Sequence, residues 1–530
     1  MGQTVLITDA VSPVCIELLE QEGFNVNLQL KKSKEELKVL AAEADGWIIR
    51  SGTQITPDLI DAADGLQVIG RAGVGVDNVN LDAATRKGIL VINAPDGNTV
   101  STAEHTCAML LALARHIPQA NASLAGGAWE RKSFTGAEVE EKVLGVIGIG
   151  KIGRAVAYRM QSFGMKILGF DPVLSKEAAE RLGIELVGLD EIFAESDFIT
   201  VHTPLNDATR GIVGTATLAK CKRGVRIVNC ARGGIVDEKA LLAALESGQV
   251  GGAALDVYSQ EPPPEGLEGL LRHPNVVATP HIAASTGEAQ EKVARQITEQ
   301  VILALKGKPV STAVNALAIK MAGQSEVQPF LRLAEKLGRI ARQLSNGMLK
   351  KVKVSCQGDV PHRYADVLSI AVLKGMLDDV LSEPVNLINA SVLAENMGLT
   401  IEEQRGSSPG SFTNLIEVIL ETADGTRHVS GTVFGSDDPR LVRVDEYNVE
   451  VKLEGRLMFY KNEDRPGMVA AVGGILAESG INIGVLQLGR TGGRGGIALT
   501  ALSVDDDISD DVVNQIEALD GVQGVKLVYL

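Results

Sequence analysis

Short runs of β-branched residues alternate with helical patterns from the N-terminus to about residue 305 of this 530-residue chain. Parallel strands need crossover connections, usually helices, so this alternation predicts parallel sheets covered by helices. The expected strands form two series. They are residues 5–8, 47–50, 68–70 and 89–93, then 143–148, 167–170, 198–201, 225–229, 253–257 and 276–278. The pattern predicts the α/β fold class, with two doubly wound parallel-sheet domains.

The pattern changes twice in the second half of the chain. Lys306-Gly307-Lys308-Pro309 is expected to end a long helix and to begin a linker. Residues beyond it show a mixed, less regular pattern up to about residue 451, which indicates an α+β segment. From Gly455 onward the order strand, helix, strand, glycine-rich hairpin, strand, helix, strand predicts a ferredoxin-like βαββαβ domain.

Charge, aromatic content and cysteine usage exclude several classes of partner. The chain has 51 basic and 67 acidic residues and a net charge of −16, which disfavours nucleic acid and anionic membrane surfaces. Only 3 % of the residues are aromatic, too few for rows of base-stacking side chains. The five cysteines form no CxxC motif or zinc-ligand spacing, so reduced thiols and no metal site are expected. With no secretory signal evident at the N-terminus, we expect a cytoplasmic protein.

The strongest chemical signal is Gly148-Ile149-Gly150-Lys151-Ile152-Gly153, which directly follows a predicted strand and opens a helix. Glycines at this spacing allow a tight turn, the approach of a pyrophosphate and close packing of helix against sheet. Asp171 lies at the end of the next strand, where its carboxylate can bind the adenosine ribose. No arginine for a 2′-phosphate occurs at residues 172–174, so the sequence predicts NAD rather than NADP.

Polar residues follow the later strands at their carboxyl ends, where doubly wound sheets bind ligands. Oxidation of a secondary alcohol by hydride transfer requires a base, a group that orients the base and a cation for the substrate. His281 suits the first role, Glu261 the second and Arg232 the third. Each could separately be a structural residue, but together with a dinucleotide motif they favour catalysis.

The chain resembles the D-isomer-specific 2-hydroxyacid dehydrogenases in several motifs. They are residues 148–153, Asp171, residues 201–205, 229–238 and 254–258, Glu261-Pro262 and Pro280-His281. The resemblance implies that Arg232, Glu261 and His281 are catalytic. It implies NAD contacts from Gly148, Gly150, Lys151, Ile152, Gly153, Asp171, His202, Thr203, Pro204, Cys230, Ala231, Arg232, Asp256, His281, Ala283 and Ala284. It further implies two Rossmann/flavodoxin-like domains, a discontinuous substrate domain (1–97 and 283–315) and an NAD domain (98–282). An intervening domain (316–452) and an ACT regulatory domain (453–530) complete the expected division.

The substrate-side segments 49–51, 70–78, 93–98 and 129–132 resemble family members that act on a phosphorylated hydroxyacid. An acidic protein must gather local cations to bind such a substrate. The residues implied to bind it are Arg50, Arg71, Asn98, Arg131, Arg232 and His281. Arg131 is implied to come from a partner subunit, in a homo-oligomer that is either a dimer or a tetramer. The expected reaction is oxidation of 3-phospho-D-glycerate to 3-phosphooxypyruvate, at the head of the phosphorylated route to L-serine.

The C-terminal segments 462–467 and 481–483 resemble an ACT domain, whose amino-acid sites lie at the first turn and between paired domains. Asp464 and Asn482 are therefore candidate effector residues. Asp464 stands where some serine-inhibited relatives carry asparagine, so the effector stays open.

Two alternatives to the main reading remain. A glyoxylate or hydroxypyruvate reductase would not need the cluster of Arg50, Arg71 and Arg131. An NAD(H)-sensing corepressor of the same family would retain the three catalytic residues without turnover. The remaining histidines, which have no partner at catalytic or metal-ligand spacing, are expected to be structural or solvated. They are His105, His116, His273, His362 and His428.

Overall fold

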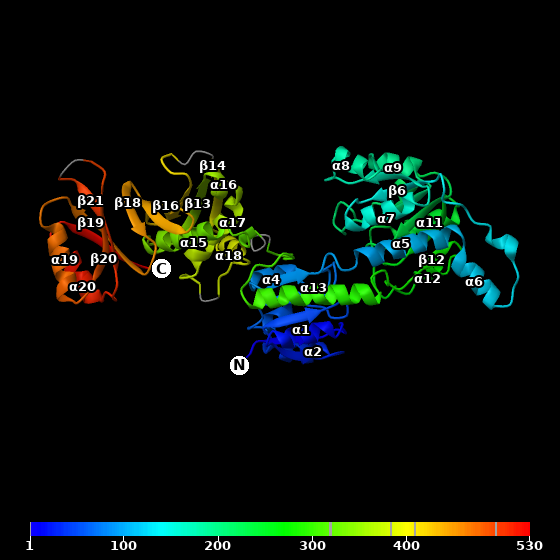
Figure 1. Ribbon diagram of the computed structural model, residues 1–530, viewed down its shortest axis with the longest axis horizontal. Helices are drawn as coiled ribbons and strands as arrows, with labels where there is room; N and C mark the ends of the chain where they lie inside the picture. The colour runs from blue at the N-terminus through cyan, green and yellow to red at the C-terminus, as the bar shows by residue number, and fades with distance from the viewer. Residues whose placement is uncertain (1, 317–320, 382–383, 407–409, 493–494) are drawn as a thin grey trace. The chain divides into compact units, whose positions relative to one another are not determined.

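Four sheets form the part of the chain that the computed structural model describes, residues 2–530 without 317–320, 382–383, 407–409 and 493–494 (Figure 1). The chain divides into two units, one comprising the residues up to Asn93 with Ile297–Leu530, the other Ala94–Gln296. Among the described residues, no helix combines the length and the apolar character that a membrane span requires.

The second unit is built on a seven-stranded parallel sheet in the order β12-β11-β10-β9-β6-β7-β8. Its strands are β6 (Val143–Ile147), β7 (Lys166–Phe170), β8 (Glu185–Leu186), β9 (Phe198–Val201), β10 (Val225–Asn229), β11 (Val250–Leu255) and β12 (Val276–Ala278). The strand order reverses between β6 and β9, which creates the switch point where doubly wound sheets bind ligands. Six of these strands agree with the predicted series within a few residues at each end. The two-residue β8 was not predicted.

Helices cover both faces of this sheet, as near-continuous apolar strands require. They are α5 (Thr99–Ala114), α6 (Ile117–Ala125), α7 (Lys151–Gln161), α8 (Lys176–Arg181), α9 (Leu189–Glu195), α10 (Thr215–Leu218), α11 (Glu238–Glu246) and α12 (Glu268–Leu271), with a 3₁₀ turn η1 (Arg131–Phe134). Helix α5 lies against α7 and the ends of β10, β11 and β12. It therefore runs directly beneath the segment that carries His281.

The first unit begins with a five-stranded parallel sheet in the order β2-β1-β3-β4-β5. Its strands are β1 (Thr4–Ile7), β2 (Asn25–Leu28), β3 (Gly46–Ile49), β4 (Val68–Arg71) and β5 (Leu90–Asn93), joined by α1 (Val14–Gln21), α2 (Lys34–Ala42), α3 (Pro57–Ala62) and α4 (Leu81–Arg86). The edge strand β2 was not predicted because asparagines interrupt its apolar residues. The end of α13 (Gly287–Leu305) packs on this sheet, where a Cβ on Gly70 would lie 2.6 Å from Val301 Cγ2.

The mixed segment forms a six-stranded sheet in the order β14-β13-β15-β16-β17-β18. The pair β13–β14 is parallel and the other pairs are antiparallel. The strands are β13 (Leu349–Gln357), β14 (Thr400–Gly406), β15 (Leu415–Thr422), β16 (Gly425–Phe434), β17 (Asp438–Val444) and β18 (Tyr447–Lys452). The helices are α15 (Gln328–Gln343), α16 (Asp359–Arg363), α17 (Ala365–Leu377) and α18 (Ala390–Asn396).

The C-terminal domain has the predicted βαββαβ order. Its elements are β19 (Arg456–Glu463), α19 (Met468–Glu478), β20 (Ile483–Arg490), β21 (Ile497–Val504), α20 (Asp510–Glu517) and β22 (Val522–Tyr529). The antiparallel sheet runs β20-β21-β19-β22, the ferredoxin-like arrangement. Part of the predicted glycine-rich hairpin, residues 493–494, lies outside the described residues. The four sheets confirm the predicted fold class.

Helices α15 and α17 approach each other closely at two glycines. A Cβ on Gly338 would lie 2.0 Å from the carbonyl oxygen of Val372, and a Cβ on Gly375 would lie 1.9 Å from that of Glu335. A Cβ at either position would therefore force the two helix backbones apart. Gly338→Ala is therefore expected to lower the free energy of unfolding by about 1–3 kcal/mol, measured by chemical denaturation.

Gly474 in α19 supplies the control for this substitution. A Cβ there meets no described atom within 4 Å, so Gly474→Ala should be neutral or stabilise by up to ~1 kcal/mol through helix propensity. A Gly338→Ala protein as stable as the parent would contradict the close approach of α15 and α17.

Candidate active site

The glycine-rich turn between β6 and α7 has the geometry that a dinucleotide needs. Gly148 adopts φ +94°, and a Cβ there would lie 2.7 Å from the carbonyl oxygen of His202. A Cβ on Gly153 would lie 2.1 Å from the carbonyl oxygen of Gly148, so this position sets the close packing of helix on turn. Gly150 caps α7 and faces open space. The N-terminal N–H groups of α7 can therefore receive a phosphate.

Asp171 follows β7 and holds the same turn in place. Its Oδ2 accepts a hydrogen bond from Ile149 N at 2.9 Å, and its Oδ1 accepts from Val173 N and Leu174 N. A carboxylate offers about four acceptor positions, so one remains for a ribose hydroxyl. Lys151, at the start of α7, forms an ion pair with Asp96.

Two buried polar atoms at the end of β9 have no partner among the described residues, namely His202 Nδ1 and Thr203 Oγ1. The other ring nitrogen, His202 Nε2, lies 3.0 Å from Thr200 Oγ1. Burial lowers the pKa of His202 to about 4, so this imidazole binds a proton too weakly to act as the base near pH 7. Orphaned polar atoms beside an open glycine turn fit a bound dinucleotide. Thr203 and the adjacent Pro204 thus lie where the sequence predicts cofactor contacts.

The loop after β10 presents Arg232. Asn229 is buried and fixes this loop, because its Oδ1 accepts from Ala231 N and its Nδ2 donates to Arg232 O. Arg232 Nη1 donates to Ala231 O at 2.8 Å. A Cβ on Gly233 would lie 1.7 Å from Tyr258 O, so glycine allows this loop to pack against the segment that carries Glu261.

Glu261 and His281 form a hydrogen-bonded pair. Glu261 Oε2 lies 2.6 Å from His281 Nδ1, and Glu261 Oε1 accepts from Tyr258 N at 3.1 Å. Both side chains are partly exposed. The carboxylate therefore holds one ring nitrogen and leaves Nε2 available to a substrate. The arrangement is that of an acid–base residue oriented by a carboxylate.

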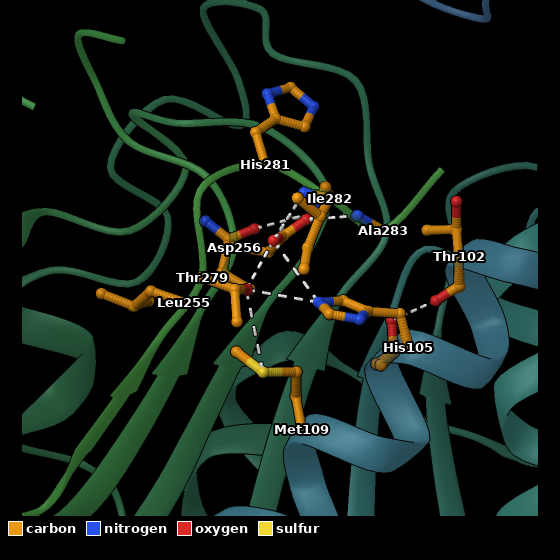
Figure 2. Close-up of polar contacts among 12 residues, drawn as sticks. Thr102, His105, Met109, Leu255, Asp256, Thr279, His281, Ile282 and Ala283 are labelled. Carbon is orange, nitrogen blue, oxygen red and sulfur yellow. Dashed lines mark hydrogen bonds and ion pairs between the residues drawn. The ribbon is translucent and has the colours of Figure 1, made fainter. Parts of the chain in front are cut away.

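Asp256 is fully buried at the end of β11 and organises the segment around His281 (Figure 2). Its Oδ1 accepts from Ile282 N at 2.9 Å and from Thr279 Oγ1 at 2.5 Å, and its Oδ2 accepts from Ala283 N at 2.8 Å. Ala284 follows in the same segment. A buried carboxylate with this many donors is a fixed structural anchor.

Two further buried side chains, Cys230 and Tyr258, lie near Asp256. Burial, with the charge of Asp256 nearby, raises the pKa of the Cys230 thiol to about 12. Burial and the same carboxylate raise the pKa of Tyr258 to about 12, so its hydroxyl stays a donor, to Thr279 O at 2.9 Å. Within the described residues, no three His, Cys, Asp or Glu side chains gather as metal ligands.

The residues expected to bind the substrate lie in both units. In the first unit, Arg71 ends β4 and pairs in register with Ile49, the residue before Arg50. The two arginines thus lie at the carboxyl ends of the neighbouring strands β3 and β4. Arg50 Nη1 donates to Ala10 O, and the guanidinium of Arg71 lies over Gly73.

In the second unit, Asn98 caps α5 and Arg131 begins η1. Asn98 Oδ1 is buried without a partner among the described residues, as expected of an atom that awaits a ligand. Arg131 is exposed.

The two candidate effector residues are engaged within the C-terminal domain. Asp464 Oδ1 accepts from Arg490 Nη2 at 2.9 Å. Asn482 Nδ2 donates to Asp505 Oδ2 at 2.6 Å, and Asn482 N donates to Asp506. The buried Oδ2 of Asp464 has no partner among the described residues, so an effector could bind this atom without displacing Arg490.

Models of three protein families match this chain. They describe the NAD binding domain of D-isomer specific 2-hydroxyacid dehydrogenases (residues 107–283), the D-3-phosphoglycerate dehydrogenase intervening domain (326–445) and the ACT domain (457–521). D-3-phosphoglycerate dehydrogenase of Archaeoglobus fulgidus is 43% identical over 98% of this chain and 98% of its own length. The chain belongs to the D-3-phosphoglycerate dehydrogenase family. The family member of Synechocystis sp. is 40% identical over 99% of this chain and 94% of its own length.

A solved structure resembles the dehydrogenase part of this family member. Glyoxylate reductase of Paecilomyes thermophila superposes with a TM-score of 0.54 at 32% identity, over 59% of this chain and 98% of its own. The matches confirm two predictions: the family resemblance and NAD as the cofactor.

Two contacts near the site could not be predicted from the sequence. His105 is expected to be structural or solvated, and its Nε2 lies 3.4 Å from Asp256 Oδ1, which is a structural contact. Glu238 accepts hydrogen bonds from Ser259 N and Ser259 Oγ and so anchors the loop before Glu261. Neither contact has a signal in the sequence, because the partners are far apart along the chain.

The cofactor preference is expected to depend on the charge of Asp171. Asp171→Asn retains one acceptor oxygen but removes the charge that is expected to repel a 2′-phosphate and to bind the ribose. The ratio of kcat/KM for NAD to that for NADP is therefore expected to fall about tenfold or more, as for loss of a charged hydrogen bond.

Asp190→Asn, an exposed acid paired with Lys220 in the same domain, should leave this ratio unchanged. An unchanged ratio in Asp171→Asn as well would remove Asp171 from the ribose site.

Proposed function

We propose that this chain catalyses the NAD-dependent oxidation of 3-phospho-D-glycerate to 3-phosphooxypyruvate, the first step of the phosphorylated route to L-serine. The observation that carries the proposal is the hydrogen-bonded Glu261–His281 pair, which follows strands of the sheet that also carries the glycine turn. Relatives named D-3-phosphoglycerate dehydrogenase match nearly the full length of the chain. The expected assignment of the catalytic, cofactor and substrate residues is part of the proposal.

His281 acts as the base at a defined atom. Its Nδ1 is held by Glu261 Oε2, so Nε2 takes the proton of the substrate hydroxyl. The carboxylate of Glu261 stabilises the imidazolium that forms. When bound, NAD supplies the acceptor for the hydride. Arg232 holds the substrate carboxylate, because its planar guanidinium matches that group and stays charged.

Arg50 and Arg71 are proposed to bind the substrate phosphate. Their positions at the carboxyl ends of the neighbouring strands β3 and β4 bring two permanent cations to the same side of the sheet in an acidic protein. Asn98 is also proposed to contact the substrate, and Arg131 is proposed to act from a partner subunit. The domain boundaries at residues 97/98, 282/283, 315/316 and 452/453 remain predictions.

A homo-oligomer and a cytoplasmic location belong to the same proposal. Helix α6 and the residues after it expose Ile117, Leu124 and Trp129, which are 54 %, 58 % and 77 % exposed. Apolar side chains gathered on one segment favour a protein interface. The five cysteines are all free, as expected of a reducing compartment.

Glyoxylate or hydroxypyruvate reductase is the second candidate, favoured by the solved reductase that superposes on this chain. That structure covers only 59% of the chain, whereas the phosphoglycerate dehydrogenases cover the C-terminal half as well. The deciding experiment compares initial rates of NADH formation from 3-phosphoglycerate and from D-glycerate. Faster turnover of 3-phosphoglycerate supports the proposal, and preference for the unphosphorylated acid supports the reductase. Tight NADH binding with no turnover of either would indicate a corepressor.

The acid–base pair generates the next prediction. His281→Ala should lower kcat by about 10²–10⁴, the usual contribution of general acid–base catalysis, with NADH affinity largely retained. Glu261→Gln should lower kcat by about tenfold or more, because an amide cannot stabilise the imidazolium as the carboxylate does.

The rate constant kcat is measured with both NAD and substrate saturating. An unchanged kcat in Glu261→Gln means that Glu261 does not support the base. Glu265→Gln, in the same loop, is the matched control and should keep the parent kcat.

Substitutions of Arg50, Arg71 and Arg232 distinguish recognition of the substrate phosphate from recognition of its carboxylate. Arg50→Ala or Arg71→Ala should raise KM for 3-phosphoglycerate by about tenfold to more than a hundredfold, the value of a charge-assisted hydrogen bond. KM for D-glycerate should change little. Arg232→Ala should damage both substrates alike, because both present the carboxylate. Equal losses on both substrates from Arg50→Ala and Arg71→Ala would exclude the phosphate role.

A further inference from the structure

His105 projects from α5 toward the buried carboxylate of Asp256 (Figure 2). Its Nε2 lies 3.4 Å from Asp256 Oδ1 and 3.3 Å from Thr279 Oγ1. The side chain is only 19 % exposed, whereas that of Asp256 is fully buried. A polar ring aimed at a buried charge from a neighbouring helix is a specific contact rather than a solvated surface group.

The direction of the hydrogen bonds follows from the number of protons available. The hydroxyl of Thr279 has one proton, and the 2.5 Å distance to Asp256 Oδ1 assigns that proton to the carboxylate rather than to Met109 Sδ at 3.9 Å. Both groups that face His105 Nε2 are then acceptors. His105 therefore donates from Nε2, whichever of the two oxygens receives the bond.

Asp256 transmits this contact to the backbone that carries His281. Its two oxygens hold Ile282 N and Ala283 N, which directly follow His281, and Thr279 lies two residues before it. His281 itself adopts φ +53°, in the left-handed region that side chains other than glycine disfavour. The surrounding contacts must hold this conformation in place.

The buried carboxylate depends on its complete set of donors. Burial by itself raises the pKa of Asp256, but hydrogen bonds from His105, Thr279 and the backbone of Ile282 and Ala283 outweigh it, and the pKa lies below its usual value. Removal of one donor leaves a buried charge less well satisfied. The network then loosens where it contacts the backbone.

We propose that His105 is a positioning residue, which holds the backbone of residues 279–283 through Asp256 and Thr279 and so keeps His281 within reach of Glu261. This inference rests on the proposed function, which assigns His281 as the base. His105 does not contact the substrate in this role. It acts from the helix below the site.

The test uses the full chain and three variants. His105→Phe keeps the ring volume without a donor, and His105→Gln keeps an N–H donor. Glu104→Gln is the control, because Glu104 lies next to His105 on α5 but is exposed and pairs with Arg159 instead of Asp256. Hydrogen–deuterium exchange at Ile282 and Ala283 reports on the backbone without any ligand, and kcat and KM report on the reaction.

His105→Phe is expected to speed exchange at these two amides and to lower kcat, each about tenfold, as for one lost hydrogen bond to a charge, with KM little changed. His105→Gln should recover most of both effects, and Glu104→Gln should match the parent. If His105→Phe does not fold, His105→Leu takes its place.

Unchanged exchange at Ile282 and Ala283 in the donor-less variant overturns the inference. Equal effects of His105→Gln and His105→Phe also overturn it, because the donor would then not matter. Faster exchange that His105→Gln reverses supports the positioning role even if the parent does not turn over 3-phosphoglycerate. In that case the proposed reaction is rejected, whereas the role of His105 in holding the backbone of residues 279–283 is retained.

Discussion

The carboxyl ends of the parallel strands β6, β9, β10, β11 and β12 meet at one edge of the seven-stranded sheet, and this constraint determines the rest of the site. Parallel strands end on the same side because each helix returns the chain to the opposite edge. Residues from five separate segments therefore converge without any long-range signal in the sequence. The reversal of strand order between β6 and β9 opens the place where the glycine turn can receive a dinucleotide.

Close backbone approach is the second condition for this arrangement. Gly148 approaches His202, Gly153 approaches Gly148, and Gly233 approaches Tyr258, each at a distance that excludes a side chain. The first two contacts shape the cofactor turn and the third brings the Arg232 loop against the Glu261 segment. Glycine thus has a steric role at each point where the site is assembled.

The sheets and the outline of the site were predictable because their signals are local. Apolar runs such as those of β6 and β9 are read from a few neighbouring residues, and polar residues after such runs mark the strand ends. Strands β2 and β8 were missed because polar residues interrupt one and the other has only two residues. Domain limits and residue roles came from resemblance to a family, which spacing alone would not have supplied.

His105 and Glu238 show why the remainder could not be predicted. His105 sits in a regular helix, and nothing near it in the sequence distinguishes it from His116 or His273. Its partner Asp256 becomes its neighbour only when α5 packs beneath the end of β11. Glu238 is the first residue of α11, a position where acidic residues are common. Its hydrogen bond from Ser259 N forms only when the later loop has folded. Contacts of this kind require the assembled structure.

The buried groups around the Glu261–His281 pair hold fixed protonation states near neutral pH. Burial keeps His202 neutral with a pKa of about 4, and it keeps Cys230 and Tyr258 protonated with pKa values of about 12. Asp256 stays ionised because its four donors outweigh its burial. None of these buried groups changes charge near pH 7, so the surroundings of the partly exposed Glu261–His281 pair keep one arrangement of charges. Such fixed surroundings keep their hydrogen bonds while the proposed reaction moves a proton at His281.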